Sequence, residues 1–507
     1  MPTSLKTINS YRWSLILLIL LSTILRFSDL GSKCFWRDEA FSYEVCLEQR
    51  YDDSTPMLFY NICKPFLNLP FSPEVNGRLL SALFGVLTVW IIFLIARNIL
   101  PGKYALLVGF LSAVNPVLIQ LSQELRAYGM LTFIIALSIL SAIRIKKMAE
   151  EEGGLVLKSA FPWLVLFIIS GMIGLYTHYI MIPFLFCLLL VFAFTLLKGS
   201  SKPKDLKYLL LSYLIIAVSF MPHISKFLYR LSIHAAQAKD GLLNPFSVKV
   251  LVKSFWGMNL GYIFKFAWIK NPSTLADNLV YAVLLISASI LILLFIKGFV
   301  HLIKSKSYLS ALPIGYILFL LMYFITELSD YRQMIPVIIA HILILGVGII
   351  TFTKWKRFVG VLLVVIASGG ALIWYYSLPY PPFHQADWRK AAEYLDENVK
   401  PKDVVFAACS DLDYLTMDFY YDGELVPFDD KVKLYHTSPE HTKRTNTTYR
   451  KLMEKAADKL NLILQNNHCV YVLLGEHSDI VIKSITSGQQ VTSKYYGENL
   501  LIQKYVN

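Results

Sequence analysis

Two adjacent carboxylates, Asp38 and Glu39, follow the first apolar segment of the chain, within the run Trp36-Arg37-Asp38-Glu39. Carboxylates are costly beside hydrocarbon, so acids between apolar segments indicate a functional site. A carboxylate at the membrane surface could accept the proton of a hydroxyl group, as a general base does. The alternative is that both acids cap an interfacial helix over residues 40–47, because a helix N-terminus favours negative charge.

A second candidate group is Glu124-Leu125-Arg126-Ala127-Tyr128, between two apolar runs. A guanidinium offers paired donors that match phosphate oxygens, and Glu124 could orient the Arg126 side chain. The alternative is an arginine that reaches the lipid head groups beside a local acidic partner.

Two further positions lie at the ends of apolar runs. His178 could bind phosphate, donate a proton or ligate a metal, although a single interfacial histidine between tyrosines is also typical of packing. Arg332 could supply a second cation for phosphate. The alternative is that Tyr331 is an aromatic belt residue and that Arg332 reaches the lipid head groups.

The elements that carry these residues are membrane spans. The 507 residues are 56% hydrophobic and only 16% charged, whereas soluble domains contain about 25% charged residues. Apolar runs predict about eleven transmembrane helices, with uncertain boundaries and room for one re-entrant segment. The runs cover 13–25, 79–96, 104–121, 128–143, 160–176, 180–197, 208–221, 279–296, 308–325, 335–352 and 358–376.

Lysine and arginine accumulate in alternate loops, which predicts a cytoplasmic N-terminus. The long outer segments are then 27–78, 222–278 and the tail from 377, and every candidate residue lies at the outer end of a span. The net charge of +13 is explained by this topology and by anionic lipids, so it does not indicate nucleic acid.

The outer segments also show local structure. In the first, Asp53 is an N-cap candidate and Pro56 suits the first position of a helix with an apolar stripe. In the tail, residues 387–395 and 449–464 read as helices, and 403–408 and 469–474 as strands. This alternation predicts a small α/β domain over residues 377–507. The six cysteines show no zinc-ligand spacing, so no metal site is assigned.

Four motifs in this order resemble the C-type membrane glycosyltransferases. They are Trp36-Arg37-Asp38-Glu39-Ala40, Asp53-x-x-Pro56, the run from Arg78 to Leu87, and Glu124-x-Arg126-x-Tyr128. Within that family the chain is similar to the bacterial branch of the dolichyl-phosphate-mannose protein mannosyltransferase group, which includes the aminoarabinose transferases of lipid A. One departure is Met57, where many members have a second proline.

The resemblance implies a polytopic helical fold in a bacterial or archaeal cell membrane, and transfer of a sugar from a polyprenyl phosphate to a glycan, lipid or protein outside the cytoplasm. It implies that Asp38, with Glu39, lies at the catalytic centre, and that Glu124, Arg126 and Tyr128 lie near the donor phosphate. Asp53, Pro56 and Arg78 would shape the first loop. Metal use varies in the superfamily, so a divalent ion stays open and no cofactor is assigned.

We therefore predict an inverting transfer in which Asp38 activates the acceptor while Arg126 and Arg332 stabilise the departing phosphate. Two alternatives stay open. A polysaccharide polymerase or ligase would use a late outer loop rich in Arg and His, and residues 222–278 contain His223, Arg230 and His234. A lipid or solute transporter would instead show broken spans with ionisable residues near the membrane centre.

Overall fold

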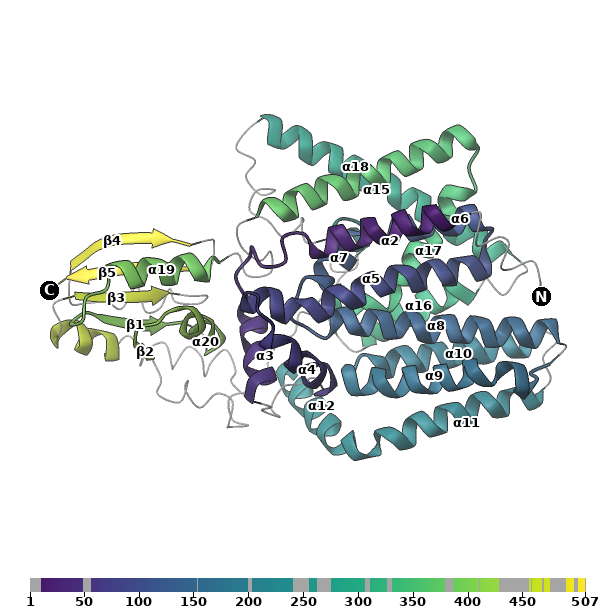
Figure 1. Ribbon diagram of the computed structural model, residues 1–507, viewed down its shortest axis with the longest axis horizontal. Coiled ribbons are helices and arrows are strands. Elements are labelled where there is room, and N and C mark those ends of the chain that lie inside the picture. Colours follow the sequence, from purple (N-terminus) through teal and green to yellow (C-terminus); the bar gives the residue numbers. More distant parts are fainter. Residues whose placement is uncertain are drawn as a thin grey trace.

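A computed structural model shows a helical bundle joined to a small sheet domain (Figure 1). It describes residues 11–48, 56–152, 154–198, 203–239, 255–261, 275–305, 311–325, 331–378, 386–409, 411–427, 456, 458–466, 469–474, 489–496 and 500–506.

The bundle consists of apolar helices, because a helix satisfies its own backbone groups in lipid. Its first half contains α2 (Arg12–Phe27), α5 (Pro73–Ile99), α6 (Gly102–Ala113), α7 (Pro116–Ser122), α8 (Tyr128–Glu151), α9 (Leu157–Thr177), α10 (Met181–Lys198) and α11 (Pro203–Phe220). The second half contains η2 (Met221–His223), α12 (Ile224–Lys239), α15 (Leu275–Lys304), α16 (Ala311–Ile325), η5 (Tyr331–Met334), α17 (Ile335–Ile350) and α18 (Lys354–Ser377).

Each predicted apolar run overlaps at least one of these helices. Among the described residues, six helices are long and apolar enough to cross a membrane, or seven if α6 and α7 form one span. Several others, including α16 and α17, are shorter apolar helices. The structure therefore supports an integral membrane protein, while the count of eleven spans and their orientation stay predictions.

The predicted run over residues 104–121 is a broken or re-entrant segment, for which the prediction left room, because the chain bends by 57° between α6 and α7. Asn115 caps α7 by accepting a hydrogen bond from the Leu118 amide, and Pro116 occupies the first helical position. The buried guanidinium of Arg26 donates to the carbonyls of Ser112 and Ala113 at the end of α6. These side chains satisfy the backbone groups that the break exposes.

The first outer segment folds into α3 (Arg37–Glu48), α4 (Leu58–Cys63) and η1 (Lys64–Asn68). Both acids lie in the first turn of α3, so the predicted helix begins earlier than residue 40. The second predicted helix begins at Leu58, after the buried Pro56. Asp53 lies outside the described residues.

Small residues allow α5 to approach the segment that carries Glu124 and Arg126. A Cβ atom on Gly85 would lie 2.0 Å from Ser122 Oγ, and one on Gly77 would lie 2.8 Å from Leu125 Cδ2. Glycine at these two positions therefore lets α5 contact α7 and the turn that follows it.

The C-terminal domain holds a five-stranded sheet in the order β2-β1-β3-β5-β4. Its elements are α19 (Trp388–Asn398), β1 (Val404–Ala408), α20 (Asp411–Tyr420), β2 (Leu425–Pro427), β3 (Cys469–Leu474), β4 (Gln489–Tyr495) and β5 (Leu501–Val506). Strands β2, β1 and β3 are parallel, whereas β5 pairs antiparallel with β3 and β4. The predicted helix from residue 387 and both predicted strands are confirmed, and residues 456 and 458–466 are helical.

The two parts have separate hydrophobic cores. Cys34 of the first outer segment belongs to the core of the sheet domain, where its thiol lies 3.5 Å from the Ala386 carbonyl oxygen. Helix α3 lies between the bundle and the sheet domain (Figure 1) and contacts α20. The segment that carries the two acids therefore lies at the junction of the two parts.

Candidate active site

Glu39 is buried in a network that fixes α3 against α5. Its carboxylate accepts two hydrogen bonds of 2.7 Å from Arg78, through Nε and Nη2, and one of 2.8 Å from the Leu125 amide. Arg78 also donates to the carbonyls of Leu30, Lys33 and Cys34. The paired geometry is that of a strong charge-assisted interaction.

Asp38, one residue earlier, has a different environment. Its side chain is 25% exposed, and its Oδ2 lies 3.8 Å from Arg332 Nη1. This carboxylate therefore faces an accessible region and has a cation beside it. Arg332 comes from the short helix η5, far along the chain from α3.

Arg126 also contacts α3. Its Nη1 donates to Ser42 Oγ at 2.9 Å and contacts the Asp38 carbonyl oxygen at 3.4 Å and the Tyr60 hydroxyl at 3.5 Å. Arg126 is 8% exposed. A second guanidinium is thus held close to Asp38 by neutral partners on α3 and α4.

Aromatic rings lie next to the guanidinium groups of Arg332 and Arg126. The Arg332 guanidinium lies 5.1 Å from the Trp36 ring and 5.6 Å from the Tyr128 ring, and Arg126 lies 6.0 Å from Tyr128. The Tyr128 ring lies 5.6 Å from that of His178, whose Nδ1 accepts the Ile180 amide. Cations over aromatic faces gain electrostatic stabilisation.

The structure thus brings together candidate residues from four separate segments of the sequence: Asp38, Arg126 with Tyr128, His178 and Arg332. Glu124 is buried on the same turn as Arg126. Tyr331 lies in η5, but its side chain is outside the described set.

The histidine and arginine loop that favoured a polymerase is described only in part. The His223 ring lies 4.6 Å from Tyr176 and 6.2 Å from Phe220, so it packs among the aromatic side chains of α9 and α11. Arg230 and His234 lie on α12, and the side chain of His234 is outside the described set.

Comparison with known proteins shows what the chain is similar to. Residues 53–225 match the family described as dolichyl-phosphate-mannose-protein mannosyltransferase. No curated protein sequence matches the chain.

Solved structures show the fold of the whole chain. The crystal structure of ArnT from Cupriavidus metallidurans bound to undecaprenyl phosphate is similar with a TM-score of 0.58 at 12% identity, covering 97% of this chain and 98% of ArnT. An oligosaccharyltransferase from Archaeoglobus fulgidus, tethered to an acceptor peptide, is similar with a TM-score of 0.54 at 13% identity, covering 92% of this chain and 69% of that one. The chain therefore has the C-type membrane glycosyltransferase fold.

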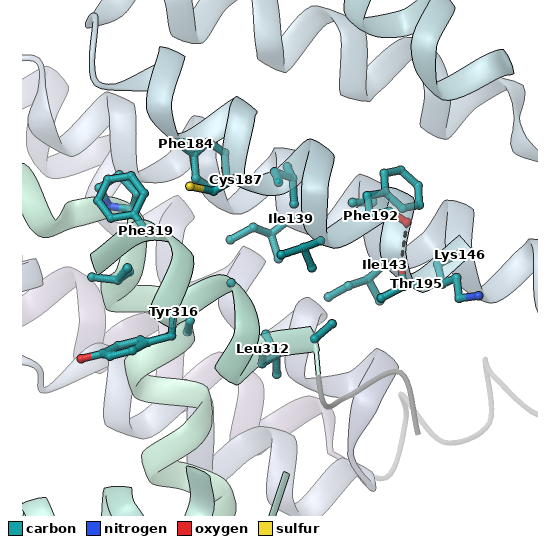
Figure 2. A pocket seen from close by; sticks show the side chains of 18 of the residues that line it. Ile139, Ile143, Lys146, Phe184, Cys187, Phe192, Thr195, Leu312, Tyr316 and Phe319 are labelled. Atoms are coloured by element: carbon teal, nitrogen blue, oxygen red, sulfur yellow. Dashed lines mark hydrogen bonds between the residues drawn. The ribbon is translucent and has the colours of Figure 1, made fainter. Parts of the chain in front are cut away.

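An apolar cavity of about 130 Å³ lies in the bundle of this glycosyltransferase fold. Figure 2 shows side chains of α8, α10 and α16 around it, with Lys146 at one end and Phe184 and Phe319 toward the other. Pro336 and Val337, which also line it, lie one turn beyond Arg332 on the same segment. The cavity is therefore lined by the start of α17, directly after the short helix η5 that gives Arg332 to the candidate site.

Sequence reasoning missed Ser42 and Tyr60, which hold Arg126. Ser42 lies four residues after Asp38, so both side chains lie on one face of α3. That spacing is a usable signal, because a helix places residues i and i+4 side by side. Tyr60 belongs to a separate helix and gives no such signal.

Proposed function

We propose that this protein is a glycosyltransferase that transfers a sugar from a polyprenyl-phosphate donor to a hydroxyl group of an extracytoplasmic acceptor. The observation that carries the proposal is the accessible Asp38 carboxylate beside Arg332 Nη1, with the Arg126 guanidinium at the backbone carbonyl oxygen of the same residue. ArnT, which shares the fold, was crystallised with undecaprenyl phosphate. A base beside two phosphate-binding cations is what transfer from such a donor requires.

In the proposed reaction, Asp38 accepts the proton of the acceptor hydroxyl while the hydroxyl oxygen attacks the anomeric carbon of the sugar. The bond between that carbon and the phosphate oxygen breaks, and its electron pair leaves with polyprenyl phosphate. Attack from the face opposite the phosphate inverts the anomeric configuration. Asp38 then releases the proton to water.

Arg126 and Arg332 receive the phosphate. Each guanidinium can donate to two phosphate oxygens, and negative charge on the phosphate grows as the bond breaks, so these contacts strengthen in the transition state. The Tyr128 ring lies next to both guanidinium groups and next to the His178 ring. We propose that Tyr128 and His178 form one wall of the donor site. Glu124 supports the turn that carries Arg126.

Glu39 has a positioning role in this proposal. Both of its carboxylate oxygens are held by Arg78, and the Leu125 amide also donates to one of them, so it fixes the first turn of α3. Arg78 shapes the preceding loop, as its contacts with three carbonyl groups support. Asp53 and Pro56 are proposed to shape the segment that leads into α4.

The apolar cavity supports the use of a lipid-linked donor. Its walls include Ile139, Phe184 and Leu312, which match the chemistry of an isoprenoid chain. Because Pro336 and Val337 follow Arg332 closely, a chain in this cavity would bring its phosphate toward the arginines. We propose that the N-terminus is cytoplasmic and that the site and the sheet domain lie outside the cytoplasm. We also propose that the enzyme transfers one sugar at a time to a glycan, lipid or protein.

The test uses the full chain in proteoliposomes, a radiolabelled mannosyl or aminoarabinosyl polyprenyl phosphate, and membranes of a deletion strain as acceptor. Asp38→Asn keeps the shape of the side chain but removes its basicity, so transfer should fall by about 100-fold or more. Glu48→Gln, at the exposed end of the same helix, is the matched control and should retain transfer.

Undiminished transfer by Asp38→Asn would remove Asp38 from the mechanism. Product analysis separates the alternatives, because a polymerase or ligase would transfer a block of sugars rather than one. Movement of intact donor across the bilayer, with no release of polyprenyl phosphate, would indicate a transporter and refute the proposal.

A further inference from the structure

The loop that leads into α3 has no regular structure, since residues 28–36 form neither helix nor strand. Its polar backbone groups are instead satisfied by side chains from two sides. On the bundle side, Arg78 donates to the carbonyls of Leu30, Lys33 and Cys34. A backbone held in this way keeps its shape only while its side-chain partners stay in place.

On the other side, the partners come from the sheet domain. Arg389, in the first turn of α19, donates to the carbonyls of Gly31 and Ser32 at 3.3 and 3.2 Å. The hydroxyl oxygen of Tyr420, at the end of α20, accepts the Phe35 amide at 2.6 Å. Phe35 lies three residues before Asp38.

Glu74, in the first turn of α5, joins these two side chains. Its Oε1 accepts Arg389 Nη2 at 2.5 Å and the Tyr420 hydroxyl at 2.8 Å. Burial raises the pKa of Tyr420, so its hydroxyl keeps the proton that it donates. Burial lowers the pKa of Arg389, but the hydrogen bond and charge of Glu74 raise it by more. The contact is therefore an ion pair with a neutral donor beside it.

Aromatic packing accompanies these bonds. The Phe419 ring lies 5.4 Å from that of Phe35 and 5.2 Å from that of Tyr43 on α3. Cys34 extends into the core of the sheet domain. The sheet domain thus contacts α3 directly as well as through the loop.

We propose that the sheet domain positions Asp38, with Tyr420 and Arg389 as the positioning residues that hold the loop from Gly31 to Phe35 against Glu74. The inference rests on the proposed function for the role of Asp38, while the restraint on the loop can be measured without it. Removing the restraint should misplace the base more than Arg126, because Tyr60 on α4 also holds Arg126 and does not depend on the loop.

The experiment compares Tyr420→Phe with Tyr495→Phe, an exposed tyrosine of the same domain. Tyr420→Phe keeps the ring but removes both hydrogen bonds of the hydroxyl. We expect kcat for sugar transfer to fall by about 10- to 100-fold, the range expected when a catalytic group is slightly misplaced. The Kd for the polyprenyl-phosphate donor should stay within about twofold of wild type. Amide exchange of peptides covering residues 30–40 should accelerate, and Tyr495→Phe should change none of these.

A wild-type kcat for Tyr420→Phe, or unchanged exchange of residues 30–40, would overturn the inference. So would a parallel loss of donor affinity and melting temperature, because general destabilisation predicts that pattern. Arg389→Gln is the second variant if Tyr420→Phe does not fold, and it should change kcat and exchange in the same direction. If the wild-type protein transfers no sugar, the proposed function fails, and the exchange experiment still decides whether the sheet domain holds the loop.

Discussion

The buried pair of Glu39 and Arg78 predicts strong energetic coupling between the two residues. Glu39→Ala removes both acceptors of the Arg78 fork and leaves the Leu125 amide without its carboxylate partner. Both side chains of the pair are almost fully buried, at 1% and 4% exposed. Breaking one side of a buried ion pair typically costs about 3–5 kcal/mol, because the remaining charge is left uncompensated.

Arg78→Met alone should cost at least as much, because it also leaves the carbonyls of Leu30, Lys33 and Cys34 without a donor. The double variant Glu39→Ala/Arg78→Met leaves no isolated charge. Its free energy of unfolding should therefore exceed the additive expectation by about 1–3 kcal/mol.

The assay is equilibrium unfolding of each variant in mixed dodecylmaltoside and SDS micelles, followed by tryptophan fluorescence. Glu48→Ala, at the exposed end of α3, is the control and should change stability by less than about 0.5 kcal/mol. The reasoning is refuted if the two single substitutions are additive within about 0.5 kcal/mol. It is equally refuted if Glu39→Ala costs no more than the control.

Two other predictions concern Arg126 and the packing of α5 on α7. Arg126→Met should weaken donor binding by about 10- to 150-fold, the equivalent of one lost charge-assisted contact of about 1.5–3 kcal/mol. Arg144→Met, near the opposite end of α8, should leave the donor Kd unchanged, and equal affinities of the two variants would contradict the role of Arg126. Gly85→Ala should destabilise the bundle by about 1–3 kcal/mol, because the added Cβ would lie 2.0 Å from Ser122 Oγ, and Gly369→Ala, where nothing lies within 4 Å, is the control in the same unfolding assay. Equal stability of the two alanine variants would show that α5 and α7 do not pack as described.

Hydropathy predicted the bundle well because each helix must satisfy its backbone within lipid, and long apolar runs report that directly. Hydropathy alone does not locate the bend between α6 and α7, since residues 104–121 are apolar on both sides of it. Asn115 and Pro116 carry a helix-start signal within that run, and Arg26 supplies the donors that the break needs from a different helix. Such a partner is visible only in three dimensions.

In the sheet domain, too, some strands are predictable from the sequence and others are not. Strands β1 and β3 are continuous apolar runs, as buried parallel strands should be, and were predicted. Strand β4, with the sequence Gln-Gln-Val-Thr-Ser-Lys-Tyr, lies at the sheet edge and has no apolar alternation, while β2 spans only three residues. Both depend on pairing with neighbours rather than on their own pattern, so neither strand carries a local signal in the sequence.

The two adjacent acids show where sequence reasoning about the site ends. Neighbouring residues on a helix point about 100° apart, so one turn of α3 can place one carboxylate inside the protein and the next outside. Nothing in Asp38-Glu39 as a dipeptide indicates which is which; Arg78 and Leu125 decide it by holding Glu39. A carboxylate with both oxygens occupied cannot approach an acceptor hydroxyl, whereas Asp38 is partly exposed beside Arg332. We therefore propose Asp38 as the base, and we propose that the pair of Glu39 with Arg78 orients the helix that presents it.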